Sequence, residues 1–159
     1  MPGDSEEGVA EVTGRPPPPA ASHQGPPRER GGVPSDAWKF LGIQLVETGE
    51  GQAVVEMEAK DQMANSLGVV HGGFIATICD SAMARAMATA IPASARQVSF
   101  DLKVNFINAA RPGERLRATA RVLHAGRSTG VAEARVEGPG RTLIATATGS
   151  FSISTEGDS

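Results

Sequence analysis

One acidic side chain stands out in this sequence of 159 residues because of its surroundings. Asp80 lies within the apolar stretch 72–90, where Arg85 is the only other charged residue. A buried carboxylate is costly unless it is paired or hydrogen-bonded, and perturbed carboxylates in apolar pockets are often catalytic. Five residues turn a helix by about 140°, so the spacing argues against an Asp80–Arg85 ion pair. Asp80 is therefore predicted to be functional, with a partner from another strand or subunit as the alternative.

The run His71-Gly72-Gly73 opens the same stretch. Free N–H groups and the macrodipole at a helix N-terminus favour negative charge, which suits a developing oxyanion. The glycines fit close packing equally well, and His71 fits either a hydrogen bond that fixes the loop or direct chemistry. Asn65 lies six residues before His71 in a predicted loop, where asparagine usually serves a turn.

The spacing of Gly72 and Asp80 indicates how the two residues would cooperate. Eight residues separate them, which is about 12 Å along a helix axis. One small carbonyl group cannot contact both residues of a single helix. If both act on it, they come from two copies whose helices pack antiparallel, which makes two equivalent sites per dimer.

Periodicity predicts the elements that position these residues. The stretch 72–90 reads as one helix that is apolar nearly all the way round and buried on several sides. Strict alternation over 97–106 predicts a strand, and short turns favour antiparallel neighbours. The sequence therefore predicts an α+β fold, a curved sheet of about six strands around one long buried helix, with open edges that favour at least a dimer. The other five strands are expected at 41–46, 52–59, 115–122, 131–136 and 143–153.

Composition excludes several classes of protein. Residues 1–34 hold eight of the eleven prolines and no Leu, Ile, Phe or Trp, which predicts a disordered tail before a domain at 35–155. A net charge of -3 excludes a basic nucleic-acid surface. The single cysteine excludes an intrachain disulfide, and no His and carboxylate cluster has metal-ligand spacing, so we expect neither metal nor cofactor. No apolar run approaches the ~20 residues of a membrane span, and a cytoplasmic location is the default expectation.

A match to the nucleophile-elbow pattern Gly-x-Ser-x-Gly occurs at 126–130. A nucleophile elbow requires a helix after the serine, whereas the residues that follow here are strand-like. The match is therefore interpreted as a hairpin turn.

The combination of these motifs resembles a known family, the hotdog-fold acyl-CoA thioesterases, and most of all its PaaI-like branch from phenylacetate degradation. The likeness covers about residues 36–153. It rests on the stretch Asn65-Ser66-Leu67-Gly68-Val69-Val70-His71-Gly72-Gly73, Asp80 nine residues after the histidine, Val98-Ser99-Phe100-Asp101-Leu102, Arg111-Pro112-Gly113 and His124-Ala125-Gly126-Arg127-Ser128.

The resemblance implies hydrolysis of acyl-CoA thioesters to free acid and coenzyme A by homodimers that pair into tetramers, without a metal. It implies that Asp80 acts as nucleophile or as general base. The backbone N–H of Gly72 would polarise the thioester carbonyl, while Asn65 and His71 would orient the carbonyl, the water or the loop. Ser99 would lie near the reacting water.

The substrate would extend away from this centre in two directions. The acyl group is expected in a slot at the dimer interface beside Gly73, Phe74 and Met83. Cationic side chains in turns or at strand starts would meet the nucleotide phosphates, and the candidates are Arg111, Arg115 and Arg127. Aryl and medium-chain acyl groups fit equally well.

Two other functions fit the same residues. A hotdog hydratase or dehydratase acting on enoyl thioesters would need His71 as its acid or base, together with a carboxylate. A non-catalytic acyl-CoA binding protein would keep the fold and bind without turnover.

Overall fold

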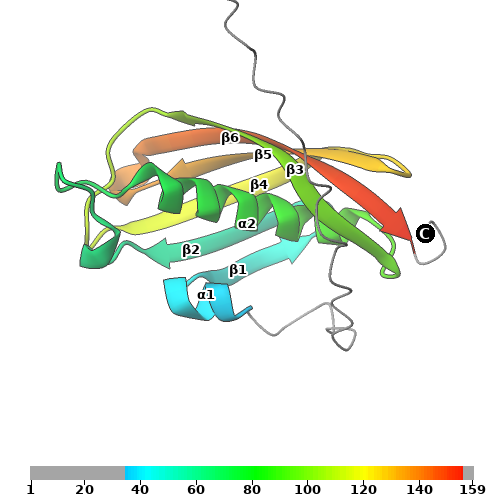
Figure 1. Ribbon diagram of the computed structural model, residues 1–159, viewed down its shortest axis with the longest axis horizontal. Helices are drawn as coiled ribbons and strands as arrows, with labels where there is room; N and C mark the ends of the chain where they lie inside the picture. Colours follow the sequence, from blue (N-terminus) through cyan, green and yellow to red (C-terminus); the bar gives the residue numbers. More distant parts are fainter. Residues whose placement is uncertain (1–34, 156–159) are drawn as a thin grey trace, which may run out of the picture.

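A six-stranded sheet wraps one long helix in the computed structural model, which describes residues 35–155 (Figure 1). The predicted tail, residues 1–34, lies outside the described residues. The elements are α1 (Asp36–Leu41), β1 (Gln44–Gly49), β2 (Gln52–Glu58), η1 (Asp61–Met63), α2 (Gly72–Ala90), β3 (Ala95–Phe106), β4 (Arg115–Ala125), β5 (Thr129–Glu137), η2 (Pro139–Arg141) and β6 (Leu143–Thr155).

The strands follow the order β1-β2-β4-β5-β6-β3, and every neighbouring pair is antiparallel. This arrangement confirms the predicted α+β hotdog architecture. Strands β1 and β3 form the two edges of the sheet. Helix α2 connects β2 to β3 and so carries the chain from one side of the sheet to the other.

Helix α2 begins and ends where the sequence predicts. His71 is its N-cap, and Pro92 follows shortly after its last residue. In a single chain the helix is buried on its sheet side, whereas Gly73 and Thr77 are exposed on the opposite side. The expected burial on several sides is therefore not seen in a single chain, where the sheet covers one side of the helix. The sheet side contributes Ile75, Ile78, Cys79, Ala82, Met83, Ala86 and Met87 to the core.

The short helix α1 was not expected, because the sequence reading placed a strand from Leu41. Ser35 caps this helix by accepting a hydrogen bond from the Trp38 N–H at 3.2 Å. Gly42 ends it in the left-handed region, at φ 78°. Strand β1 consequently starts only at Gln44.

Strand β3 contains a bulge that its regular alternation of residue types conceals. Its pairing with β6 shifts between Ser99 and Asp101, which leaves Phe100 without an opposite residue. Opposite residues of an antiparallel pair share a face, and Ser99 pairs with the buried Phe151 on the α2 side. After the bulge, Leu102 joins that side, whereas Val98 lies on the other side and is 68% exposed.

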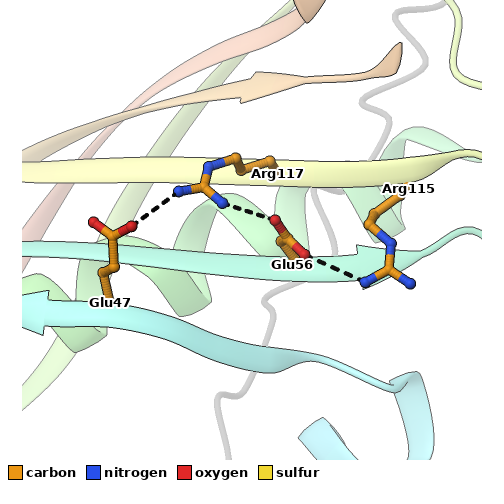
Figure 2. A network of polar contacts seen from close by, with 4 residues as sticks. All are labelled: Glu47, Glu56, Arg115 and Arg117. Carbon is orange, nitrogen blue, oxygen red and sulfur yellow. Dashed lines mark hydrogen bonds and ion pairs between the residues drawn. The ribbon is translucent and has the colours of Figure 1, made fainter.

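The sheet face turned away from α2 carries a network of ion pairs across three strands (Figure 2). Arg117 on β4 contacts Glu56 on β2 at 2.8 Å and Glu47 on β1 at 3.3 Å. Arg115 contacts the other oxygen of Glu56 at 3.3 Å. These contacts tie the edge strand β1 to β4 through β2.

Candidate active site

The loop before α2 is held by Asn65. Its Oδ1 accepts the backbone N–H groups of Leu67 at 2.9 Å and Val69 at 3.4 Å. The Asn65 N–H in turn donates to the Val69 carbonyl at 2.8 Å. The side-chain oxygen and the backbone N–H of Asn65 therefore both hydrogen-bond within this loop. Asn65 is thus a residue that fixes the shape of the loop before α2.

His71 is the N-cap of α2 and accepts a hydrogen bond from one of the first N–H groups of the helix. Its Nδ1 accepts the Gly73 N–H at 3.0 Å, and its carbonyl accepts the Phe74 N–H at 3.0 Å. Nδ1 is thus an acceptor, so in the neutral ring Nε2 carries the proton and can donate. A Cβ at Gly73 would lie 3.2 Å from Nδ1. A side chain at position 73 would therefore crowd this cap. The Gly73 N–H is already engaged, which does not favour its predicted contact with substrate.

Gly72 presents a backbone N–H that no group in residues 35–155 accepts. The neighbouring N–H groups of Gly73 and Phe74 are both bonded, so the free donor at this end of the helix belongs to Gly72. A Cβ on Gly72 would lie 2.9 Å from Cζ of Phe106. Phe106 thus packs against the Cα of Gly72, a contact that the sequence did not predict. The signal was its place at the end of the strand that runs antiparallel to the helix.

Asp80 lies half-buried near the middle of α2, and its Oδ1 is buried without a hydrogen-bond partner. No ion pair joins it to Arg85 among the described residues, and the Nε of Arg85 is likewise buried and unpartnered. This agrees with the helical spacing. Burial first, and the negative charge of Asp80 second, raise the pKa of the neighbouring Cys79 thiol to about 12.

Strand β3 runs beside this flank of α2 in the opposite direction. Phe106 packs on Gly72 at one end, and the Gln97 Nε2 donates to the Ala84 carbonyl at 2.7 Å near the other. Ser99 lies between these two contacts on the α2 side of β3. Ser99 is therefore on the same flank as Asp80, although no hydrogen bond joins the two residues in the described chain.

A groove of about 460 Å³ opens beside Gly72. It lies between the first turn of α2, the loop before it and the end of β3. Phe74 is half-buried on the first turn of α2, whereas Met83 is fully buried in the core. Met83 faces the sheet at Gly149, where a Cβ would lie 3.1 Å from its Cε. The predicted contact of Met83 with the acyl group is therefore not supported in a single chain, because Met83 lies in the core rather than in an open slot.

The three candidate arginines divide between opposite ends of the molecule. The turn Arg111–Glu114 lies near the α2 N-terminus, because Val70 N–H donates to Ala110 O at 2.8 Å. Arg127 lies in the β4–β5 turn, at the end where Thr89 Oγ1 accepts the Gly51 N–H. Only Arg111 and Arg115 therefore share an end with Gly72 within one chain.

Three further features of the described chain bear on its chemistry. Strand β5 begins at Thr129, so the Gly-x-Ser-x-Gly match forms a hairpin turn as predicted. No group of three or more His, Cys, Asp or Glu side chains between residues 35 and 155 is placed to hold a metal ion. No helix of this region combines the length and the hydropathy that a membrane span requires.

The thioesterase superfamily model matches residues 67–145. The acyl-coenzyme A thioesterase PaaI of Escherichia coli is 37% identical over 93 residues, which cover 58% of this chain and 64% of the relative. Human acyl-coenzyme A thioesterase 13 is 31% identical over 86 residues, or 54% of this chain and 61% of the relative. The chain thus matches less than two thirds of the length of these curated relatives.

Solved structures cover more of the fold. A conserved Pseudomonas aeruginosa protein superimposes with a TM-score of 0.71 at 33% identity, over 76% of this chain and 94% of the other. The E. coli PaaI protein from the phenylacetic acid degradation operon superimposes with a TM-score of 0.70 at 30% identity, over 74% of this chain and 83% of the other. With the predicted motif now on the hotdog scaffold, this chain belongs to the thioesterase superfamily, among its PaaI-like members.

Proposed function

We propose that this protein hydrolyses acyl-CoA thioesters to the free carboxylic acid and coenzyme A. The observation that carries the proposal is the buried, unpartnered Oδ1 of Asp80. A carboxylate oxygen held dry and free of hydrogen bonds is a poised base or nucleophile. The names of the E. coli and human relatives, both acyl-coenzyme A thioesterases, support the same activity.

The free N–H of Gly72 supplies the complementary group. It lies at the positive end of α2, where it donates to the thioester oxygen as negative charge develops there. The protonated Nε2 of His71 provides a second donor that orients the carbonyl, while Asn65 keeps the loop in shape. A thioester is already activated, so an aligned carboxylate and one or two preorganised donors suffice.

In the general-base route, Asp80 takes a proton from water as the water oxygen attacks the thioester carbon. The tetrahedral intermediate places its oxyanion on the Gly72 N–H. Collapse breaks the C–S bond, and the departing thiolate takes the proton from Asp80. In the nucleophilic route, an Asp80 oxygen attacks the thioester carbon, the C–S bond breaks, and coenzyme A leaves as a thiolate that takes a proton from water. A second water then hydrolyses the mixed anhydride to the free acid and the Asp80 carboxylate. Both routes require the carboxylate, and Ser99 lies on the right flank to hold the water.

The site requires two copies of the chain. Gly72 and Asp80 are about 12 Å apart along α2, so the carbonyl held by one copy meets Asp80 of the other. Pairing through the exposed edge β3 sets the two helices antiparallel and makes two equivalent sites. The same pairing brings Arg127 of the partner subunit toward the end of the molecule that holds Arg111 and Arg115, where the nucleotide phosphates would bind. Two such dimers form the expected tetramer.

The test is a hydrolysis screen over hexanoyl-, octanoyl-, benzoyl- and phenylacetyl-CoA, with a thiol reagent that detects free coenzyme A. The background is low because Cys79, the one cysteine of the sequence, is buried. Asp80→Ala should abolish turnover, and Asp80→Asn should lose about 10²–10⁴-fold while staying folded. Asp36→Asn, an exposed substitution on α1, should keep wild-type rates. Hydrolysis by the wild type no faster than by Asp80→Ala would refute the proposal.

A further inference from the structure

The edge strand β3 carries two opposite charges that have no partner in the described chain. Asp101 and Lys103 are exposed, and neither makes an ion pair or a side-chain hydrogen bond between residues 35 and 155. Leu102 between them lies on the α2 side, so the two charged side chains share the outer face of the sheet. A further strand beside β3 would therefore supply cross-strand partners for both charges.

A second copy of β3 supplies these partners in only one register. Opposite residues of an antiparallel pair share a face, so a twofold axis between two identical strands passes through a residue and not between two residues. With the axis at Leu102, Asp101 of each copy lies opposite Lys103 of the partner subunit. An axis at Asp101 or at Lys103 sets two like charges opposite each other, which is destabilising. An axis at Val104 leaves both charges without a charged partner.

We infer that Asp101 and Lys103 set the register of the dimer. Strand β3 pairs antiparallel with β3 of a second copy about an axis at Leu102, and two reciprocal ion pairs between Asp101 and Lys103 of the partner subunit hold it there. The inference rests on the proposed function and deepens it, because a site shared by two copies depends on one register. Moving the axis by one residue would slide the strands past each other by two residues, or about 7 Å.

The same register brings the two halves of the proposed site together. Phe106 of one copy lies opposite Gln97 of the other, because the bulge in β3 adds one residue on that side of the axis. Phe106 packs on Gly72. Gln97 donates to the carbonyl of Ala84, which lies about one helical turn after Asp80. The seam therefore sets the free N–H of one helix beside the part of the partner helix that carries the carboxylate.

Charge variants test the ion pairs by light scattering and sedimentation. Asp101→Lys and Lys103→Glu each set two pairs of like charges across the seam, so each should raise the dimer dissociation constant about 10- to 100-fold. Asp36→Lys, an exposed substitution on α1, is the matched control and should leave this constant unchanged.

Mixing the two weakened variants is the sharper measurement. An equimolar mixture of Asp101→Lys and Lys103→Glu restores opposite charges at both positions and should form a heterodimer with nearly wild-type affinity. Unchanged dissociation constants in the single variants, or no recovery in the mixture, would overturn the inference.

Single cysteines test the register. Opposite residues of an antiparallel pair have Cα atoms about 4.5–5.5 Å apart, within the range that a disulfide spans. Leu102→Cys should therefore form a disulfide-linked dimer on mild oxidation. Lys103→Cys should stay mostly unlinked, because its two copies are offset by two residues along the seam. Cys79 is buried and gives no background. Preferential linking of Lys103→Cys, or linking of neither variant, would overturn the register.

Hydrolysis then separates this inference from the proposed function. Turnover should fall in the two single charge variants and return in their mixture. The dimer and disulfide measurements need no substrate. A protein that pairs in the stated register but cleaves no acyl-CoA would therefore contradict the proposed function alone, whereas an active protein without the stated pairing would contradict the register alone.

Discussion

Two regions of the molecule treat charge in opposite ways. On the outer face of β1, β2 and β4, the four charged side chains of Figure 2 satisfy one another across neighbouring strands. Along the flank of α2 and β3, Asp80 Oδ1 and Gln97 Oε1 are buried with no hydrogen-bond partner in the described chain. The first region is complete within one chain, whereas the second lacks partners.

Exposed apolar groups show the same contrast. Val98 and Phe100 on β3 are 68% and 65% exposed, next to an edge with unpaired backbone groups. In a single chain these apolar side chains stay exposed, and the Asp80 Oδ1 is buried without a hydrogen-bond partner. Both features disfavour the isolated folded chain. The difference supports the proposal that the α2–β3 flank pairs with a second copy and meets the substrate, whereas the ion pairs of the outer face contribute to stability.

The most damaging change to this arrangement is a charge on the β3 edge. Phe100→Asp should weaken the proposed β3 pairing by about 2 kcal/mol or more, because it would bury an unpaired charge in that contact. Light scattering should then report monomers at concentrations where the wild type forms the proposed dimer, and hydrolysis should fall with the dimer fraction. Phe40→Asp, at a residue of α1 that is 79% exposed, is the control. A fully active Phe100→Asp monomer would contradict the shared site.

Neutralising Asp80 tests whether its charge is held at a structural cost. Asp80→Asn should raise the free energy of unfolding by about 1 kcal/mol, since an unpartnered buried charge disfavours the folded state. Urea denaturation followed by circular dichroism measures the change. A loss of stability would show that the carboxylate has a structural partner, and would weaken the catalytic assignment.

The opposite sign is expected on the outer face. Glu56→Gln removes the charge that Arg117 and Arg115 share, and should lower the free energy of unfolding by about 1 kcal/mol. Glu133→Gln is the comparison, because Glu133 has one exposed partner, Arg121, at 2.6 Å. It should cost only a few tenths of that amount. Equal losses in the two variants would mean that the network adds nothing beyond separate pairs.

The network also predicts a pH dependence. The hydrogen bond from Arg117, followed by that from Arg115, lowers the pKa of Glu56 below its ordinary 4.5, against the effect of burial. A lowered folded-state pKa stabilises the protein above the unfolded value and loses that contribution as pH falls through the folded value. The difference in unfolding free energy between wild type and Glu56→Gln should therefore be constant down to about pH 4.5 and shrink below it. If the difference in unfolding free energy grew as the pH fell, the pKa of Glu56 would be raised rather than lowered in the folded protein.

The sequence predicted the helix and its site spacing better than it predicted the sheet. Composition, His71 and Pro92 mark the α2 boundaries locally, and the Gly72–Asp80 separation follows from helix geometry alone. The bulge at Phe100 was hidden because residue types alternate regularly through it, and only the register with β6 reveals it. The Glu56–Arg117 pair was equally hidden, since β2 and β4 become neighbours only after α2 and β3 intervene.

The smallest expected effect concerns Cys79, which lies next to Asp80 but faces the core. Burial first, and the Asp80 charge second, raise the pKa of its thiol to about 12. The thiolate is the reactive form, so the native protein should resist thiol reagents at pH 8 and react fully in urea. In Asp80→Asn the weaker cause disappears while burial stays, so labelling should remain slow. Rapid labelling of that variant would show that the Asp80 charge, more than burial, keeps the Cys79 thiol unreactive.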